Sequence, residues 1–342
     1  MTTGPIPVSV ITGFLGSGKT TLLARLLHDP ALSRTAVIIN EFGAIGLDHL
    51  LVEASDEDIV ALNSGCVCCT VRGDLVRTAG DLLARRATGA VAAFERIVIE
   101  TTGLADPAPI LQALMTDAAL ADALRLESVI TTVDAAAGAA TLDAHPESVK
   151  QAALADRIVV TKTDLSDPAA SGLAGRLRAL NPAAPQLRAK HGALEASRLF
   201  GGGPYEPRLY DPRLYEGQAH GHARVTSFCI RRSAPLHAVT LSLFLQVLAE
   251  HCGASLLRLK GLVDVRESPG RPAVIHGVQH VFHPPAWLDA WPDSDHSTRI
   301  VVIAPGLDPL WLEALLDALD DEVASYKGEE KCSIYRSAAT GW

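Results

Sequence analysis

The chain has 342 residues, 48% of them hydrophobic, and a formal net charge of −9 at pH 7. This length allows about two domains with cores of their own, and the acidic balance argues against nonspecific binding to nucleic acid or to an anionic membrane. Because no signal segment opens the chain and no apolar run approaches the roughly 18 residues of a membrane-spanning helix, we expect a cytoplasmic protein. Its six cysteines are too few and too unevenly placed for a disulfide framework, so we expect them to be reduced.

The first predicted element is a buried strand over residues 8–12, followed by a glycine-rich loop and a helix. The loop reads Gly13-Phe-Leu-Gly-Ser-Gly-Lys-Thr20, the pattern of a phosphate-binding P-loop. Its glycines let successive N–H groups point at one anion, Lys19 would reach the β and γ phosphates, and the Thr20 hydroxyl would hold Mg²⁺. The alternative is an ordinary glycine turn. We predict a nucleoside-triphosphate site formed by Gly13, Gly16, Ser17, Gly18, Lys19, Thr20 and Thr21.

A polar segment follows the next predicted strand, at residues 36–39. It carries Glu41, Asp48 and His49, which can bind a metal ion or accept protons, and its glycines would let it move. On spacing alone a polar turn explains the segment better. No glutamine has an obvious water-positioning role, so Asp48 is our candidate for the hydrolytic residue.

Three cysteines, Cys66, Cys68 and Cys69, lie within four residues. Thiols this close can converge on one soft or borderline cation such as Zn²⁺, and Cu(I) and Co²⁺ fit the same ligands. The N-terminus of the amphipathic helix that follows, together with Arg72, would lower the pKa of these thiols. No second cysteine pair supplies the fourth ligand of a closed structural site, so we predict an open metal site. The alternatives are buried cysteines in a turn and a redox-active group.

Two further buried strands end in residues typical of P-loop proteins. The strand at 96–99 is followed by Glu100 and, three residues later, by Gly103. An acid at this place usually organises Mg²⁺, and the glycine N–H can sense the γ phosphate. Because Glu at a strand end is weak evidence by itself, the prediction depends on the P-loop at the end of the first strand.

The strand at 157–160 is followed by Thr161-Lys162-Thr163-Asp164, which is similar to the guanine-reading pattern Asn/Thr-Lys-x-Asp. A carboxylate at 164 can accept hydrogen bonds from N1–H and from the exocyclic amine of guanine, whereas adenine offers no donor at either place. The stem of Lys162 would lie over the base. The alternative is a turn with a helix cap at Asp164. We predict GTP rather than ATP.

The fold class follows from the apolar runs. In the first half, including 59–62 and 128–133, they are continuous and predict strands buried on both faces, as in a parallel sheet covered by helices. Strands near 225–231, 256–265, 273–282 and 299–303, with helices near 236–251 and 308–321, predict a smaller α+β domain. We predict an α/β P-loop NTPase domain over 1–190, a flexible linker with His220 and His222 over 191–223, the α+β domain over 224–325 and a tail over 326–342.

Taken together, these motifs resemble the CobW family of GTP-dependent metallochaperones, within the SIMIBI branch of P-loop GTPases. The resemblance covers nearly the whole chain and extends to Leu257-Arg-Leu-Lys-Gly-Leu262 in the second domain. It implies that Cys66, Cys68 and Cys69 bind Zn²⁺ or a similar ion with Glu41 or a nucleotide-dependent partner. It also implies slow GTP hydrolysis that changes metal exposure and client docking. Thr161 departs from the commoner Asn of the family pattern.

The sequence therefore predicts a GTPase that uses GTP/GDP and Mg²⁺, binds Zn²⁺ at the cysteine cluster and delivers it to a client apo-metalloprotein. We expect a monomer or weak homodimer, with no nucleic-acid or membrane partner. Two alternatives stay open. One is a regulatory GTPase with a structural zinc ion, and the other is a cobalt-delivery factor in cobalamin synthesis or metalloenzyme maturation.

Overall fold

The computed structural model describes residues 4–39, 71–168, 171–201, 214, 225–253 and 255–328. It divides into two compact units, Met1–Gly203 and Pro204–Trp342. The predicted strand at 59–62 and most of the predicted linker and tail lie outside the described residues. In the described parts of the chain, we find no helix with the length and apolar character that crossing a membrane requires.

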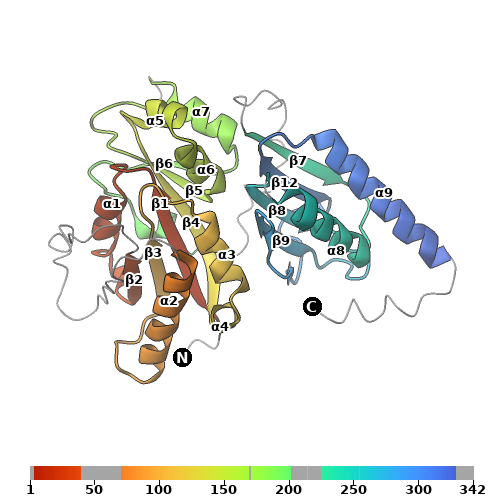
Figure 1. Ribbon diagram of the computed structural model, residues 1–342, viewed down its shortest axis with the longest axis horizontal. Helices are drawn as coiled ribbons and strands as arrows, with labels where there is room; N and C mark the ends of the chain where they lie inside the picture. The colour runs from red at the N-terminus through yellow and green to blue at the C-terminus, as the bar shows by residue number, and fades with distance from the viewer. Residues whose placement is uncertain are drawn as a thin grey trace. The chain divides into compact units, whose positions relative to one another are not determined.

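A parallel six-stranded sheet forms the centre of the first unit (Figure 1). Its order is β2-β3-β1-β4-β5-β6, so β1 lies between β3 and β4. Val10 and Ile11 are completely buried because β1 is covered on both faces. The strands are β1 (Ile6–Gly13), β2 (Thr35–Ile39), β3 (Arg96–Glu100), β4 (Leu124–Asp134), β5 (Arg157–Thr161) and β6 (Gln186–Arg188).

Helices cover both faces of this sheet (Figure 1). Leu22 of α1 packs with Val159 of β5, whereas Ala152 of α6 packs with the neighbouring Ile158 and Val160, which point to the opposite face. The helices are α1 (Lys19–Leu26), α2 (Val71–Ala87), α3 (Ala108–Thr116), α4 (Ala118–Ala121), α5 (Gly138–Ala144), α6 (Pro146–Leu154) and α7 (Leu173–Leu180), with the 3₁₀ turns η1 (Pro30–Leu32) and η3 (Ala196–Arg198).

The beginning of the predicted linker packs onto the first unit. After β6, the chain forms η3, and Leu199 and Phe200 lie in the same core cluster as α1. The Gly201 N–H donates to Glu127 Oε1 at 3.2 Å. Residues 191–200 are therefore part of this unit's packed structure.

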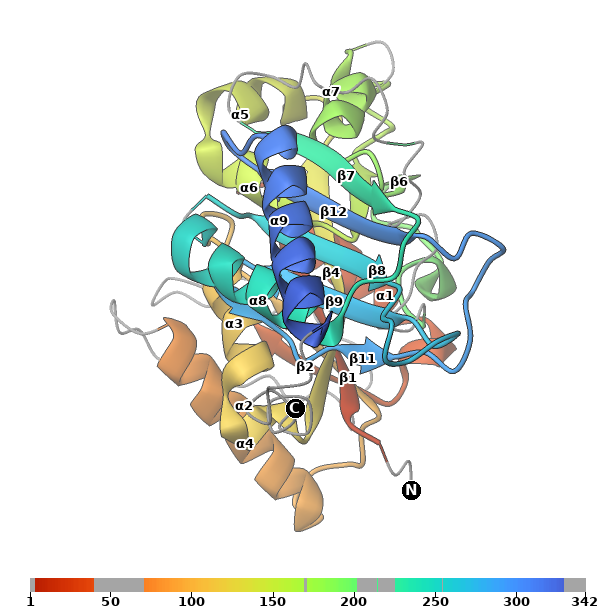
Figure 2. The ribbon, with the colours of Figure 1, turned by 90° about the vertical axis from the view of Figure 1, so that its right-hand side faces the viewer.

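The second unit contains an antiparallel sheet with two long helices on one face (Figure 2). Phe244 of α8 and Leu316 of α9 pack with Ile300 of β12. The predicted strand at 273–282 is divided by a turn, and Val281 pairs back with Val278. The elements are β7 (Thr226–Arg232), α8 (Ala238–Val247), the π-helix η6 (Leu248–Cys252), β8 (Arg258–Val263), β9 (Ala273–Val278), β10 (Val281–Phe282), β11 (Ala286–Trp287), β12 (Thr298–Ala304) and α9 (Pro309–Gly328).

The topology places three of the sequence motifs at one edge of the parallel sheet. The carboxyl ends of parallel strands face the same crevice, where ligands bind in open α/β sheets. The loop at 13–18 follows β1, Glu100 ends β3, and Thr161 ends β5. The fold thus brings together groups that lie far apart in the sequence.

Candidate nucleotide-binding site

The loop between β1 and α1 requires glycine at defined positions. Gly13 has φ 142°, and a Cβ atom there would lie 2.3 Å from Thr132 Oγ1 and 2.8 Å from Ser17 Oγ. Gly18 has φ 89° and forms the left-handed N-cap of α1. The Ser17 and Thr132 hydroxyls are 2.6 Å apart and form a hydrogen bond. β4 therefore supports the loop at the N-terminus of α1, the kind of helix end that binds anions.

Lys19 lies inside this loop rather than extending into solvent. Its side chain is buried, and Nζ donates to the carbonyl oxygens of Gly13 at 2.9 Å and Phe14 at 3.1 Å. Phosphate oxygens would offer charge-assisted acceptors to the same ammonium group. Lys19 is thus held within the loop, as its predicted contact with the β and γ phosphates requires.

Thr20 in the first turn of α1 reaches the end of β3. Its Oγ1 donates to Glu100 Oε1 at 2.6 Å, and Glu100 is only 5% exposed. A hydroxyl and a carboxylate side by side are hard oxygen ligands of the kind that Mg²⁺ prefers. These two residues therefore fit the magnesium site predicted from the sequence. Thr21, the next residue, is exposed on α1.

The loop after β3 lies directly against the P-loop. A Cβ atom on Gly103 would lie 2.6 Å from the backbone nitrogen of Leu15 and 2.7 Å from its Cα. Only glycine allows this approach without moving one of the two loops. Gly103 is consequently held against the P-loop, as its predicted role of sensing a γ phosphate requires.

The end of β5 contacts the P-loop from another side. Thr161 Oγ1 donates to the Ser17 carbonyl oxygen at 2.6 Å. Lys162 adopts a left-handed backbone conformation, with φ 54°, and its Nζ donates to Asp134 Oδ2 at 2.7 Å. Asp164 Oδ2 lies 3.7 Å from His191 Nδ1. Thr161, at the position where the guanine-reading pattern more often has asparagine, thus contacts the phosphate loop.

Asp134 at the end of β4 is ionised readily despite partial burial. Burial alone would raise its pKa, but hydrogen bonds from Lys162 and from the backbone N–H groups of Ala136 and Ala137 outweigh it, so the pKa is lowered. The resulting ion pair anchors the side chain of Lys162, whose stem is predicted to lie over the base.

Several predicted site residues lie outside the described residues. They are Glu41, Asp48, His49, Cys66, Cys68, Cys69, His220 and His222. Within the described ranges, no group of three or more His, Cys, Asp or Glu side chains is arranged to hold a metal ion. The cysteine metal site and the hydrolytic role of Asp48 stay predictions.

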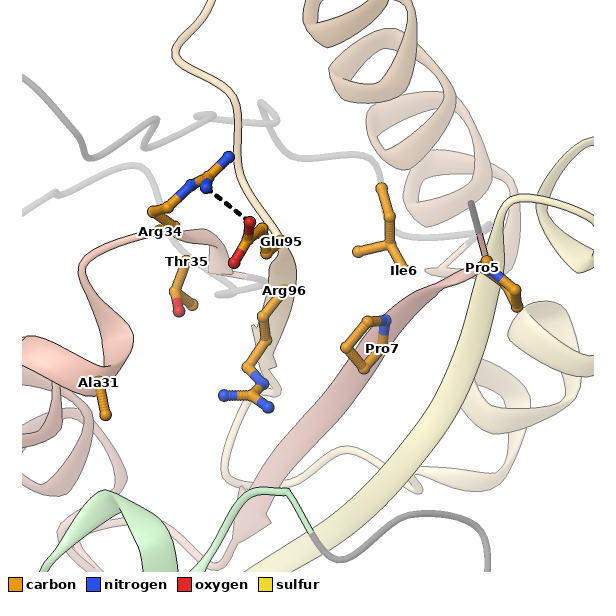
Figure 3. Close-up of a pocket in the computed structure, with 9 residues that line it drawn as sticks. Pro5, Ile6, Pro7, Ala31, Arg34, Thr35, Glu95 and Arg96 are labelled. Carbon is orange, nitrogen blue, oxygen red and sulfur yellow. Dashed lines mark ion pairs between the residues drawn. The ribbon is translucent and has the colours of Figure 1, made fainter. Parts of the chain in front are cut away.

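A pocket of about 390 Å³ lies at the other end of the sheet (Figure 3). It is lined near the starts of β1, β2 and β3, and the Arg34–Glu95 ion pair, 2.6 Å between Nη1 and Oε1, stands on its wall. Because the P-loop follows the opposite end of β1, this pocket is separate from the candidate nucleotide site.

Three residues of the site were missed by sequence reasoning. Asp134 directly follows the buried run 128–133, so the signal that identified Glu100 could also have identified it. Thr132 lies within that run and carries no motif. Gln151 of α6 donates from Nε2 to the carbonyl oxygens of Gly103 and Ala105, a long-range contact without a sequence pattern.

Known proteins and family models match both units of the chain. Residues 7–188 match the family model "CobW/HypB/UreG, nucleotide-binding domain", and residues 225–320 match "Cobalamin synthesis protein cobW C-terminal domain". The chain is 33% identical over 302 residues to the zinc chaperone YjiA of Escherichia coli (strain K12), covering 87% of this chain and 94% of that protein. It is 33% identical over 309 residues to the zinc chaperone CobW of Sinorhizobium sp, covering 79% and 83%.

A solved structure is similar over the same extent. The crystal structure of Zn(II)-bound YjiA GTPase from E. coli has a TM-score of 0.69 and 27% sequence identity, and the match covers 92% of this chain and 99% of that one. Both units of the present chain therefore have counterparts in one solved protein.

Proposed function

The chain belongs to the CobW family of P-loop proteins, and on this premise we propose that it is a GTPase that binds zinc and delivers it to client metalloproteins. The main support for nucleotide binding is the 2.6 Å hydrogen bond between Thr20 Oγ1 and Glu100 Oε1, which lies beside a P-loop with a buried lysine. The similarity to two zinc chaperones and to a zinc-bound GTPase supports the binding and delivery of zinc.

We propose a role for each site residue toward the nucleotide. The loop N–H groups and Lys19 bind the phosphates, and Asp164 accepts hydrogen bonds from guanine. Thr20 and Glu100 would hold Mg²⁺, which when bound neutralises charge on the β and γ phosphate oxygens. Gly103 presents its backbone close to the terminal phosphate. Asp48 is the proposed residue that positions water.

Zinc is the cargo of this protein. Cys66, Cys68 and Cys69 supply soft sulfur ligands, with Glu41 as a further ligand. Because thiolates bind zinc only when they are not oxidised, we place the protein in the cytoplasm, where thiols are kept reduced. Contacts made only with the γ phosphate provide the free energy that changes metal exposure between GTP and GDP states. The partner is a client apo-metalloprotein, and the chain acts as a monomer or weak homodimer.

The test combines GTP turnover with metal analysis of the purified full-length chain. We expect slow GTP hydrolysis and zinc retained at one ion for each chain, measured by elemental mass spectrometry. Lys19→Ala is expected to abolish turnover and to retain zinc, whereas Cys68→Ser is expected to lose zinc and to retain GTP binding. Partners captured in the GTP state and identified by mass spectrometry should include an apo-metalloprotein that accepts the ion.

Three outcomes would contradict the proposal. Absence of GTP turnover excludes the GTPase. Unfolding of the first unit on chelation indicates a structural zinc ion and a regulatory GTPase. Selective retention of cobalt from a mixture of divalent ions indicates a cobalt-delivery factor.

A further inference from the structure

Helix α6 contacts both of the loops that surround the proposed place of the γ phosphate. His145, which precedes the helix, stacks on Phe14 of the P-loop with ring centroids 4.3 Å apart and planes inclined by 28°. One and a half turns into the helix, Gln151 Nε2 donates to the carbonyl oxygens of Gly103 at 3.2 Å and Ala105 at 3.0 Å. One short helix thus joins the loop after β1 to the loop after β3.

Gln151 is firmly placed. It is 1% exposed, and its backbone carbonyl oxygen accepts a hydrogen bond from Thr131 Oγ1 of β4 at 2.7 Å. Its side-chain Oε1 is buried and has no hydrogen-bond partner among the described residues. A buried unpaired acceptor costs free energy. Packing alone therefore would favour an apolar side chain here, and the distinctive contribution of this amide is its pair of donors to residues 103 and 105.

The segment held by Gln151 has little freedom to move. On one side, Gly103 lies against the backbone of Leu15 so closely that a Cβ atom would overlap it. On the other side, Asp106 Oδ2 accepts from Lys150 Nζ at 3.2 Å. A shift of residues 103–105 away from the P-loop would break both hydrogen bonds of Gln151. The P-loop, the loop after β3 and α6 therefore each contact the other two. Leu15 of the P-loop lies against Gly103, Gln151 of α6 donates to Gly103, and His145 before α6 stacks on Phe14 of the P-loop.

We propose that Gln151 is a positioning residue that holds residues 103–105 against the P-loop. In this position the Gly103 N–H contacts the γ phosphate of GTP. Through Gln151, binding of the γ phosphate also affects α6. This inference rests on the proposed GTPase function. Gln151 acts through Gly103 and does not contact the nucleotide. Its effect therefore falls on the difference between GTP and GDP, because GDP has no γ phosphate for Gly103 to contact.

Asn181, which caps the C-terminal end of α7, provides a matched control because its side chain also donates to the backbone of α6. Its Nδ2 donates to the carbonyl oxygens of Ala152, Ala153 and Ala155, and it is 2% exposed. It therefore holds the C-terminal end of α6 with the same chemistry that Gln151 uses toward residues 103 and 105. A merely structural role for Gln151 predicts that both amides behave alike.

The experiment compares wild type, Gln151→Met and Asn181→Leu as full-length chains. For Gln151→Met we expect kcat for GTP to fall by about 10- to 100-fold, with the Kd of GDP within about twofold of wild type. The preference for a non-hydrolysable GTP analogue over GDP should fall by about fivefold or more. Asn181→Leu should lower the melting temperature and leave this preference unchanged. Equal effects of the two substitutions on the preference, or no effect of Gln151→Met, overturn the inference.

A measurement on the wild type covers the case in which Gln151→Met does not fold. Replacing GDP by the GTP analogue should slow amide hydrogen exchange in residues 103–106 and 145–151 together. A change in the first segment without one in α6 overturns the inference and leaves the GTPase proposal intact. A wild-type chain that hydrolyses no GTP overturns both.

Discussion

Thr161 at the end of β5 donates its hydroxyl hydrogen to the carbonyl oxygen of Ser17, 2.6 Å away in the P-loop. Thr161 is 3% exposed, and a Cβ atom on Gly18 would lie only 3.5 Å from its methyl carbon Cγ2. The strand end that precedes Lys162 and Asp164, the residues proposed to read the base, is therefore joined directly to the P-loop. This contact gives Thr161 a structural role at the position where the guanine-reading pattern more often has asparagine.

Thr161→Val should weaken nucleotide binding by removing this donor while keeping the shape of the side chain. The buried Ser17 carbonyl oxygen would lose a partner, at a cost of about 1 kcal/mol or more, or roughly a fivefold or larger rise in the Kd of GDP. Titration with a fluorescent GDP analogue measures this change. Thr163→Val is the control, because the Thr163 hydroxyl donates to Ala189 and not to the P-loop. An equal effect of the control would contradict the assignment.

Asp164→Asn should change base specificity. The amide can still accept from N1–H of guanine but faces the exocyclic amine with its own donor, so we expect GTP to bind about 100-fold more weakly. Xanthosine triphosphate carries a carbonyl at that place and should then bind better than GTP. Competition titrations measure both. Asp167→Asn alters a nearby exposed aspartate, paired with Arg188, and should leave the order unchanged. Unchanged GTP preference in Asp164→Asn would place the base elsewhere.

Glu100→Gln should raise the Mg²⁺ concentration needed for GTP turnover and lower kcat by about 10-fold or more. The physical reason is that an amide oxygen is a weaker ligand than the carboxylate that Thr20 contacts. Turnover measured across a Mg²⁺ titration gives both quantities. The matched variant is Glu95→Gln, at the other end of β3, where the carboxylate pairs with Arg34. If both variants keep the wild-type Mg²⁺ dependence, Glu100 does not help to bind Mg²⁺.

The pair of Asp134 and Lys162 should stabilise the first unit in a pH-dependent way. The pKa of Asp134 is lowered in the folded state. Its contribution to stability is therefore present above the pKa of an unfolded aspartate, near 4, and is lost as the pH falls through the lower folded value. We expect Asp134→Asn to melt at a lower temperature than wild type near neutral pH, and the difference to shrink below about pH 4. Thermal scans between about pH 3 and pH 7 measure it. A difference that grows toward acid would contradict this sign.

The fold was predictable from the sequence where local signals agree with the tertiary structure. Val8, Val10 and Ile11 form one continuous apolar run, and the structure confirms a strand buried on both faces followed by the glycine loop and α1. The α/β fold with a smaller second domain is confirmed as well, as is the family resemblance. β6 was not predicted, because Gln186–Arg188 is short and polar at the edge of the sheet, where pairing with β5 determines its conformation.

Other features depend on contacts that no local pattern encodes. The sequence assigned residues 191–200 to a flexible linker because the composition changes there, yet Leu199 and Phe200 are buried by long-range packing. The run 273–282 has strand composition throughout, but the chain turns at Gln279, which has φ 54°. In the candidate site, the residues that end the buried strands could be predicted from the sequence. The role of Gln151 could not, because it follows only from the proximity of α6 to the loop after β3.

The most direct test of the account is the zinc affinity of the purified chain, measured by competition with a chelator of known affinity, with a non-hydrolysable GTP analogue and then with GDP. We expect the Kd of zinc to differ by about fivefold or more between the two states, and Lys19→Ala to abolish the difference. Equal zinc affinity in both states, with GTP binding intact, would contradict the coupling of nucleotide and metal on which the proposed function depends.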